Sequence, residues 1–156
     1  RRQRQMCIRD RSYLSDKLLT EGNTVAALDE LYIWLSDNVA VGTTIIEYIR
    51  NCLKRVRKKE SAMLLASQNL EDFNQEGIRE LTKPLFAIPP HQFLFNAGAV
   101  DKKFYMEALQ LEESEYNLIR FPQRGVCLYR CGNERYLLEV HAPAYKEALF
   151  GKAGGR

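Results

Sequence analysis

Long apolar segments are missing from this sequence. No run of apolar residues approaches the roughly 20 that a membrane-spanning helix needs. The arginine-rich start is not followed by the apolar stretch typical of a signal peptide, so we expect neither a membrane span nor a secretory signal. Proline is also scarce, with five in 156 residues, while 46% of residues are hydrophobic. This composition excludes wholesale disorder and predicts one folded domain.

Cysteine is infrequent and is not arranged for metal binding. The four cysteines are Cys7, Cys52, Cys127 and Cys131. No two have the C-x-x-C spacing, and both histidines are distant from the C-x-x-x-C formed by the last two. A zinc site is therefore not expected. We interpret the cysteines as reduced, which favours a cytoplasmic location.

The net charge of +3 comes from the first eleven residues. Residues 1–11 hold five arginines and one aspartate, whereas the rest of the chain has 18 basic and 19 acidic side chains. This segment lacks helical or strand periodicity. It is either a basic arm for nucleic acid or a foreign-looking or disordered leader; we favour the leader and exclude it from the fold prediction. The glycine-rich segment 151–156 is expected to be a flexible tail.

Hydrophobic periodicity between these ends predicts an α/β fold. Helices are expected over 13–20, 31–37, 39–59, 76–85, 102–109 and 112–118, and strands over 24–28, 62–66, 92–96, 126–130 and 135–140. The first two strands and the long helix between them predict a βαβ unit. The near-continuous apolar run of the first strand predicts a strand covered on both faces. The last two strands flank Gly132-Asn133 and predict a β-hairpin.

The long helix is predicted to be amphipathic. Its apolar positions recur at helical spacing on one face, at Ile45, Ile49, Cys52, Leu53 and Val56. Arg50, Lys54 and Lys58 fall on the opposite face, and Arg57 lies at the border. The apolar face, and not the basic one, is the face expected to be buried.

Polar side chains follow the first two predicted strands. Asp29 and Glu30 come directly after one strand, and Gln68 follows the other. Ligands of parallel sheets bind outside the carboxyl ends of the strands. In such a place one carboxylate can hold Mg²⁺, a second can accept a proton from water, and an amide can contact a phosphate. The alternatives are acids that stabilise a helix N-terminus and a glutamine that caps a loop.

A wider pattern gives this set a context. The segment DELYIWLSDNVAVGTTIIEYIRNCLKRVRKKESAMLLASQNLEDF, residues 29–73, resembles the C-terminal half of the VirB/TraE-type ATPases of conjugation and type IV secretion, in the HerA/FtsK branch of RecA-like motors. Their pattern is an Asp-Glu pair (the Walker B motif), a helix ending in Arg-Lys, and a strand ending in Ala/Ser, Ser/Thr and Gln. Phe-Leu-Phe-Asn96, the segment 111–115 and a closing hairpin follow in the family's order, so the resemblance covers residues 13–150.

This resemblance implies a fold and an activity. The fold would be part of a RecA-like P-loop NTPase core over residues 12–150, a mainly parallel sheet with helices that ends in a β-hairpin. The full-length protein would be a homo-hexameric ATPase that uses ATP and Mg²⁺. It would lie in the cytoplasm or peripherally on the inner face of the membrane. There it would act with other secretion-channel components, with DNA as a further partner.

The resemblance also implies residue roles. Asp29 would support Mg²⁺ through water, Glu30 would be the catalytic base, and Gln68 would sense the γ-phosphate. Arg57 would act on the nucleotide of a neighbouring subunit. For Arg57 the alternative is a solvated basic helix face.

One part of the family pattern is missing. No G-x-x-x-x-G-K-[ST] occurs, although this loop cradles the phosphates of P-loop enzymes. We therefore expect an N-terminally truncated piece of a longer motor that is inactive alone. The alternatives are a non-catalytic α/β module that binds nucleic acid or a secretion partner, and a DNA-pumping ATPase like FtsK or HerA.

Overall fold

The computed structural model describes residues 12–31, 39–68, 70, 73, 79–96, 98 and 100–151. The chain divides into two compact units, residues 1–89 and residues 90–156. Three predicted segments lie wholly or largely outside the described residues: the leader over 1–11, the helix over 31–37 and the tail over 151–156.

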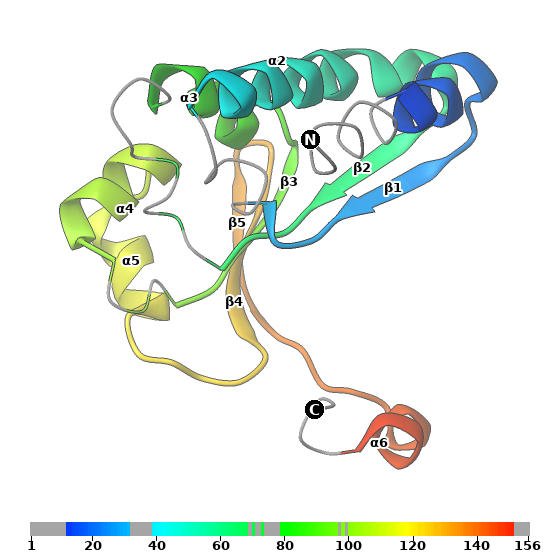
Figure 1. The fold of residues 1–156 in the computed structure, drawn as a ribbon. Coiled ribbons are helices and arrows are strands. Elements are labelled where there is room, and N and C mark those ends of the chain that lie inside the picture. The colour runs from blue at the N-terminus through cyan, green and yellow to red at the C-terminus, as the bar shows by residue number, and fades with distance from the viewer. Residues whose placement is uncertain are drawn as a thin grey trace. The chain divides into compact units, whose positions relative to one another are not determined.

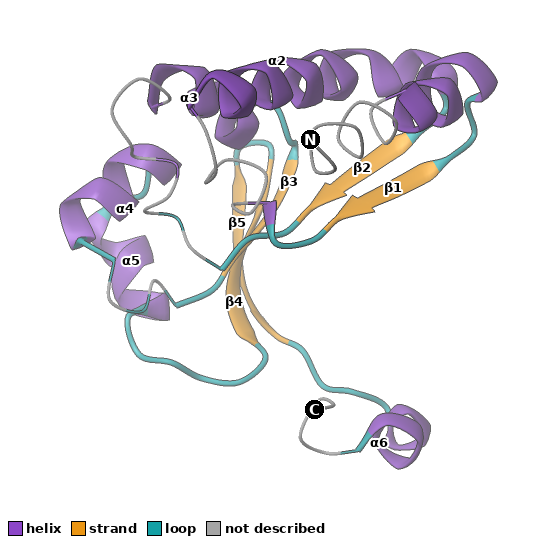
Figure 2. Ribbon diagram, in the orientation of Figure 1, coloured by secondary structure: helices purple, strands orange, loops and turns teal. Residues whose placement is uncertain are grey.

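The first unit is built around two parallel strands. Its elements are η1 (Asp16–Glu21, π-helical), β1 (Val25–Leu28), α2 (Val39–Arg55), the 3-10 turn η3 (Val56–Lys59), β2 (Ala62–Leu65) and α3 (Arg79–Ala87) (Figure 1). β1 and β2 pair in parallel, with Val25 opposite Ala62 and Leu28 opposite Leu65. Figure 2 shows the two strands side by side with the α2 helix running along them. The predicted βαβ unit is confirmed.

The apolar face of α2 forms the core of this unit. The buried cluster consists of Leu31, Ile45, Ile46, Ile49, Phe73 and Leu85, with Leu28, Met63 and Leu65 of the strands packed against it. Cys52 of α2 is also buried, and Val56, the first residue of η3, is buried against Leu18 and Ala26. The predicted stripe is therefore confirmed. Burial of this face stabilises α2, since helices in water depend mostly on tertiary packing.

The opposite face of the β1–β2 pair is exposed. Burial alternates along both strands, and the outward side chains Val25 and Leu64 are 75% and 58% exposed. The prediction that the first strand is covered on both faces is therefore wrong for the described part of the chain. Packing from α2 and η1 accounts for the covered face.

Gly22 joins η1 to β1 where the backbone requires glycine. Its φ is +76°, and a Cβ built on it would lie 2.6 Å from the carbonyl oxygen of Lys59. The same oxygen accepts a hydrogen bond of 2.9 Å from the Asn23 N–H. A Gly22→Ala substitution should therefore lower the free energy of unfolding by about 1–3 kcal/mol, the usual cost of such strain. Urea unfolding followed by circular dichroism measures this loss.

Gly132 provides the matched control. Its φ is +60°, but no heavy atom lies within 4 Å of a Cβ built there. Gly132→Ala should carry the cost of left-handed backbone without the clash, about 1 kcal/mol. Equal losses at both positions would contradict the role assigned to the Lys59 carbonyl.

The second unit is built around an antiparallel sheet. It contains β3 (His91–Leu94), α4 (Lys102–Leu109), α5 (Glu113–Ile119), β4 (Val126–Cys131), β5 (Glu134–Glu139) and α6 (Ala144–Phe150). The strand order is β3-β4-β5, with both pairs antiparallel. Gly132 and Asn133 form the tight turn between β4 and β5, so the predicted hairpin is confirmed, as are the helices at 102–109 and 112–118.

The fold is a mixed α/β arrangement, and the prediction of a mainly parallel sheet is wrong for the described residues. The strand predicted at 92–96 appears as β3, but it pairs antiparallel with β4, with Phe93 opposite Tyr129. The hairpin presents an open edge on β4, which satisfies the backbone groups of β3. Apolar composition indicates that a strand forms but does not decide its direction of pairing.

Helix α6 was not predicted. None of its residues is buried, and Tyr145, Leu149 and Phe150 are largely exposed. Its seven residues are fewer than the window of about 11–18 residues in which helical periodicity is recognised, so the sequence pattern gave little signal there.

Candidate functional site

The candidate site lies at the carboxyl ends of β1 and β2. Backbone pairing continues past both strands: Ala66 N–H donates to the Leu28 carbonyl at 2.9 Å, and Leu31 N–H donates to the Ala66 carbonyl at 3.0 Å. The two chain segments therefore stay together beyond the strands. This pairing brings the residues after β1 close to those after β2.

The backbone at Glu30 is unusual. Its φ is +50°, a left-handed conformation that is uncommon for residues other than glycine. The Glu30 N–H donates to Asp29 Oδ1 at 2.9 Å. Such conformations cost of order 1–3 kcal/mol, and they cluster at functional sites. Here the turn directs the side chain of Glu30 toward the end of β2.

Glu30 and Gln68 are in direct contact. Gln68 Nε2 donates a hydrogen bond to Glu30 Oε1 at 2.5 Å, across 38 positions of sequence. The other carboxylate oxygen, Oε2, is shielded from solvent and has no hydrogen-bond partner among the described residues. Asp29 and Gln68 are exposed, and Glu30 is half-buried. Three of the four predicted site residues thus share one sheet edge.

Arg57 lies elsewhere. It belongs to η3, the turn that precedes β2, whereas Gln68 follows β2. Arg57 is therefore at the opposite end of the strand from the other three residues. It is exposed, as are the neighbouring Lys58 and Lys59. Within one chain, this arrangement excludes direct action of Arg57 on a ligand at Asp29 and Glu30.

The oxygen atoms at this edge fit a hard cation better than a transition metal. Asp29 offers an exposed carboxylate, whose Oδ1 accepts from the Glu30 N–H. The described residues contain no group of three or more His, Cys, Asp or Glu side chains able to hold a metal ion. Mg²⁺ is commonly held by one or two carboxylates together with waters and substrate phosphates. Asp29 fits that role when a phosphate supplies the remaining ligands.

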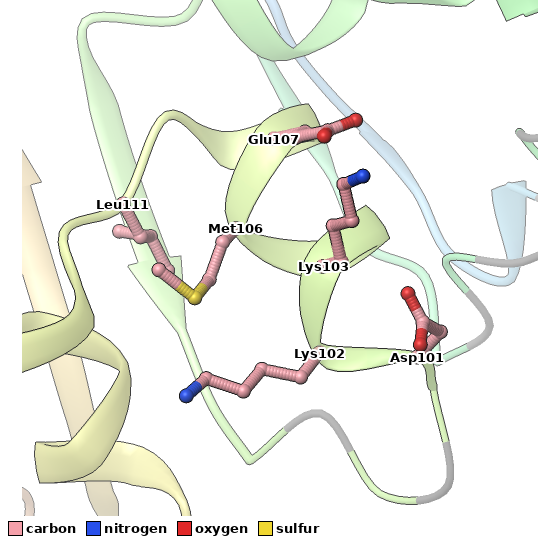
Figure 3. A pocket seen from close by; sticks show the side chains of 6 residues that line it. All are labelled: Asp101, Lys102, Lys103, Met106, Glu107 and Leu111. Atoms are coloured by element: carbon pink, nitrogen blue, oxygen red, sulfur yellow. The ribbon is translucent and has the colours of Figure 1, made fainter.

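A shallow hollow of about 490 Å³ lies beside α4 in the second unit (Figure 3). Its lining includes Asp101, Lys102, Lys103, Met106, Glu107 and Leu111. The Asp101 side chain caps α4 by accepting from the Phe104 N–H at 2.9 Å. Lys102 Nζ pairs with Glu113 at 2.5 Å. Asp101 and Lys102 of the hollow therefore already have structural partners, and we assign no ligand to it.

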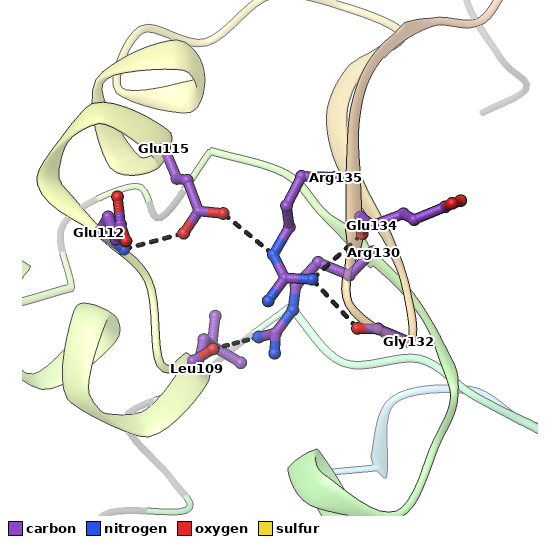
Figure 4. A network of polar contacts seen from close by, with 7 residues as sticks. All are labelled: Leu109, Glu112, Glu115, Arg130, Gly132, Glu134 and Arg135. Atoms are coloured by element: carbon purple, nitrogen blue, oxygen red, sulfur yellow. Dashed lines mark hydrogen bonds and ion pairs between the residues drawn. The ribbon is translucent and has the colours of Figure 1, made fainter.

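A polar network ties α4 and α5 to the hairpin (Figure 4). Arg135 Nε donates to Glu115 Oε1 at 2.9 Å, and Glu115 Oε2 accepts from the Glu112 N–H at 2.8 Å in a capping box. Arg130 donates to the Leu109 carbonyl. Burial lowers the pKa of the Arg130 guanidinium, and the nearby charge of Arg135 lowers it further. The acidic residues Glu112, Glu113 and Glu115 therefore stand at the N-terminus of α5.

Glu115 should carry much of the stability of this network. Its side chain is 17% exposed and joins Arg135 to the start of α5. Glu115→Ala should lower the free energy of unfolding by about 1–3 kcal/mol, because it removes two hydrogen bonds to a charged group. Glu113→Ala is the control: Glu113 is 69% exposed where it pairs with Lys102. That change should cost much less than Glu115→Ala, because an exposed ion pair contributes little to stability. Equal losses would contradict the network's structural role.

The solved structure of VirB4 from Thermoanaerobacter pseudethanolicus superimposes with a TM-score of 0.74 at 24% sequence identity, over 86% of this chain and 35% of that one. The chain shares its fold with part of VirB4. No protein-family model matches the chain, and no curated protein matches it. This chain therefore spans about a third of the VirB4 length. In its described residues, no helix is long and apolar enough to cross a membrane.

Proposed function

We propose that this chain is part of an ATP-hydrolysing motor of type IV secretion or conjugation, with a RecA-like core. The observation that carries the proposal is the contact of Glu30 with Gln68 beside Asp29, at the carboxyl ends of two parallel strands. The fold shared with part of VirB4 supports the same proposal. The likeness to VirB4 concerns only the fold. The support for hydrolysis therefore comes from Asp29, Glu30 and Gln68.

Each residue has a proposed role. Asp29 supports Mg²⁺ through water, and the ion would neutralise charge on the phosphates of ATP. Glu30 accepts a proton from the attacking water. Gln68 responds to the γ-phosphate. Arg57 acts on the nucleotide of a neighbouring copy, which agrees with its exposure and its distance along the strand from the chain's own site.

The proposed assembly is the one that the resemblance to VirB/TraE-type ATPases implies. The motor would be a homo-hexamer in the cytoplasm or on the inner face of the membrane, working with other secretion-channel proteins and with DNA. A DNA-pumping ATPase like FtsK or HerA would use the same Asp29, Glu30 and Gln68. DNA-stimulated hydrolysis that needs no secretion component would favour that alternative.

A non-catalytic module is the second candidate. Two observations favour it: the sequence has no G-x-x-x-x-G-K-[ST], and Arg57, Lys58 and Lys59 form an exposed basic cluster. Such a cluster could bind nucleic acid through phosphates. The test is phosphate release from ATP by the protein encoded by the complete reading frame. Mg²⁺-dependent hydrolysis that Asp29→Asn abolishes supports the motor; no hydrolysis, with DNA binding lost in Arg57→Ala, supports the module.

A further inference from the structure

The connection from α5 to β4 presents two arginines and an aromatic ring to solvent. It spans residues 120–125 in the second unit, and Figure 1 shows it leaving the end of α5 and entering the start of β4. Every residue from 120 to 124, RFPQR in sequence, is exposed. Packing within the described part of the chain therefore does not account for the phenylalanine and the two arginines of this loop.

The guanidinium of Arg120 lies over the ring of Phe121. Its Cζ is 5.4 Å from the ring centroid, within the range of a cation–π interaction. This contact restrains the ring, yet Phe121 remains 71% exposed. The loop thus offers an open aromatic surface next to a positive charge.

Hydrogen bonds at both ends hold the backbone of this loop. Asn96 Nδ2 donates to the carbonyl of Ile119 at 3.0 Å and to the carbonyl of Arg120 at 2.6 Å. At the other end, the Val126 N–H donates to the Gln123 carbonyl at 3.2 Å. A loop that is ordered before binding loses less conformational entropy when a ligand arrives, so its side chains are suited to recognition.

The charges of the loop are not neutralised by the rest of the described chain. Neither Arg120 nor Arg124 forms an ion pair with another described residue. Glu139, opposite Val126 on β5, contacts His141 at 3.3 Å. A single exposed phenylalanine is ordinary on a protein surface. The two unpaired guanidinium groups in the same loop decide the class of ligand, because guanidinium binds phosphate and stacks on planar groups.

We propose that residues 120–124 bind single-stranded nucleic acid, with a base stacked on Phe121 and with Arg120 and Arg124 on the neighbouring phosphates. Single strands fit better than duplexes, because the bases of a duplex are already stacked on one another. The inference rests on the proposed function only for the nucleic-acid partner. It needs neither ATP nor the residues at the ends of β1 and β2, so its failure and that of the hydrolysis proposal are separate results.

The stacking is tested by titrating this chain into a fluorescent oligothymidine of about 16 nucleotides and measuring anisotropy. Phe121→Ala should weaken binding by about 5–150-fold, the contribution of one stacked base. Phe121→Leu should weaken it similarly, whereas Phe121→Trp should retain it. Phe150→Ala is the matched control: Phe150 is 69% exposed on α6, and its loss should leave the affinity unchanged. Because all these side chains are exposed, the variants should fold, and circular dichroism verifies this.

Phe121→Leu also separates nucleic acid from a protein partner. Leucine preserves an apolar contact but has no π surface on which a base can stack. Wild-type affinity in Phe121→Leu would overturn the proposal and leave an apolar protein contact as the explanation. A folded wild-type chain that does not bind the oligothymidine would overturn it as well.

The phosphate contacts are tested by repeating the titration between about 50 mM and 200 mM salt. Arg124→Ala should reduce the slope of log K against log salt concentration by about 0.7, the value for one phosphate of a single strand. Losses confined to Arg57→Ala would assign binding to the basic cluster of η3 and overturn the proposal. A duplex of the same length should bind more weakly and be insensitive to Phe121→Ala. Equal affinity for duplex and single strand would contradict base stacking.

Discussion

Hydrolysis of ATP by the complete protein should fall by about 10²–10⁴-fold when Glu30 is replaced by glutamine, the range that a general base contributes. Glutamine keeps the size of the side chain but cannot accept a proton from water. Nucleotide binding should change little, because the loss falls on the chemical step. Phosphate release at saturating ATP gives kcat, and fluorescent-nucleotide titration gives the affinity.

Glu60 is the matched control for this change. It is an exposed glutamate with φ of +53°, close to the +50° of Glu30, but it lies before β2 instead of beyond the strand ends. Glu60→Gln should leave kcat within about 2-fold of the wild type, because Glu60 lies at the opposite end of β2 from Asp29, Glu30 and Gln68. If both variants lose activity equally, the loss is not specific to Glu30 and the base assignment of Glu30 is wrong.

Ile46→Ala should lower the free energy of unfolding by about 2–5 kcal/mol. Ile46 is fully buried in the α2 core with Ile45, Ile49 and Phe73. Truncation removes apolar contacts and leaves a cavity that the close-packed strands and helix cannot fill completely. Urea unfolding followed by far-ultraviolet circular dichroism measures the change.

The neighbouring Glu47 separates packing from helix propensity. It is exposed on α2, so Glu47→Ala should change stability by no more than about 0.5 kcal/mol. A small loss in Ile46→Ala, similar to that in Glu47→Ala, would mean that the α2 face is not a packed core.

Local sequence patterns predicted the helices and turns that are formed by interactions between residues close in sequence. The 3.6-residue period of α2 identifies its buried face because packing on one side repeats along the sequence, as Ile45, Ile49 and Cys52 show. Gly132-Asn133 marks the hairpin because a two-residue turn requires a left-handed backbone, and Gly132 has φ of +60°. The parallel alignment of β1 with β2 was predictable since a strand, a crossover helix and a second strand have few alternative arrangements.

Features set by long-range contacts were not predictable in the same way. β3 pairs with the strand whose free edge lies beside it, which is β4. The amino-acid composition of β3 does not specify that strand. Asp29, Glu30 and Gln68 could be expected at one sheet edge, but not the bond from Gln68 to a single oxygen of Glu30, which depends on the left-handed turn. Arg57 is different, because its place before the strand predicted at 62–66 already puts it at the opposite end from Gln68.

The uncovered side of the β1–β2 pair affects how the proposed ring can be studied. Val25 and Leu64 present aliphatic surface to water beside two strands, each with one edge unpaired among the described residues. Such surfaces associate with copies of themselves, in geometries unrelated to motor assembly. Particle sizes measured on this chain at high concentration therefore report association through these exposed surfaces as well as assembly of the proposed ring. Subunit stoichiometry is better measured on the complete protein with nucleotide bound.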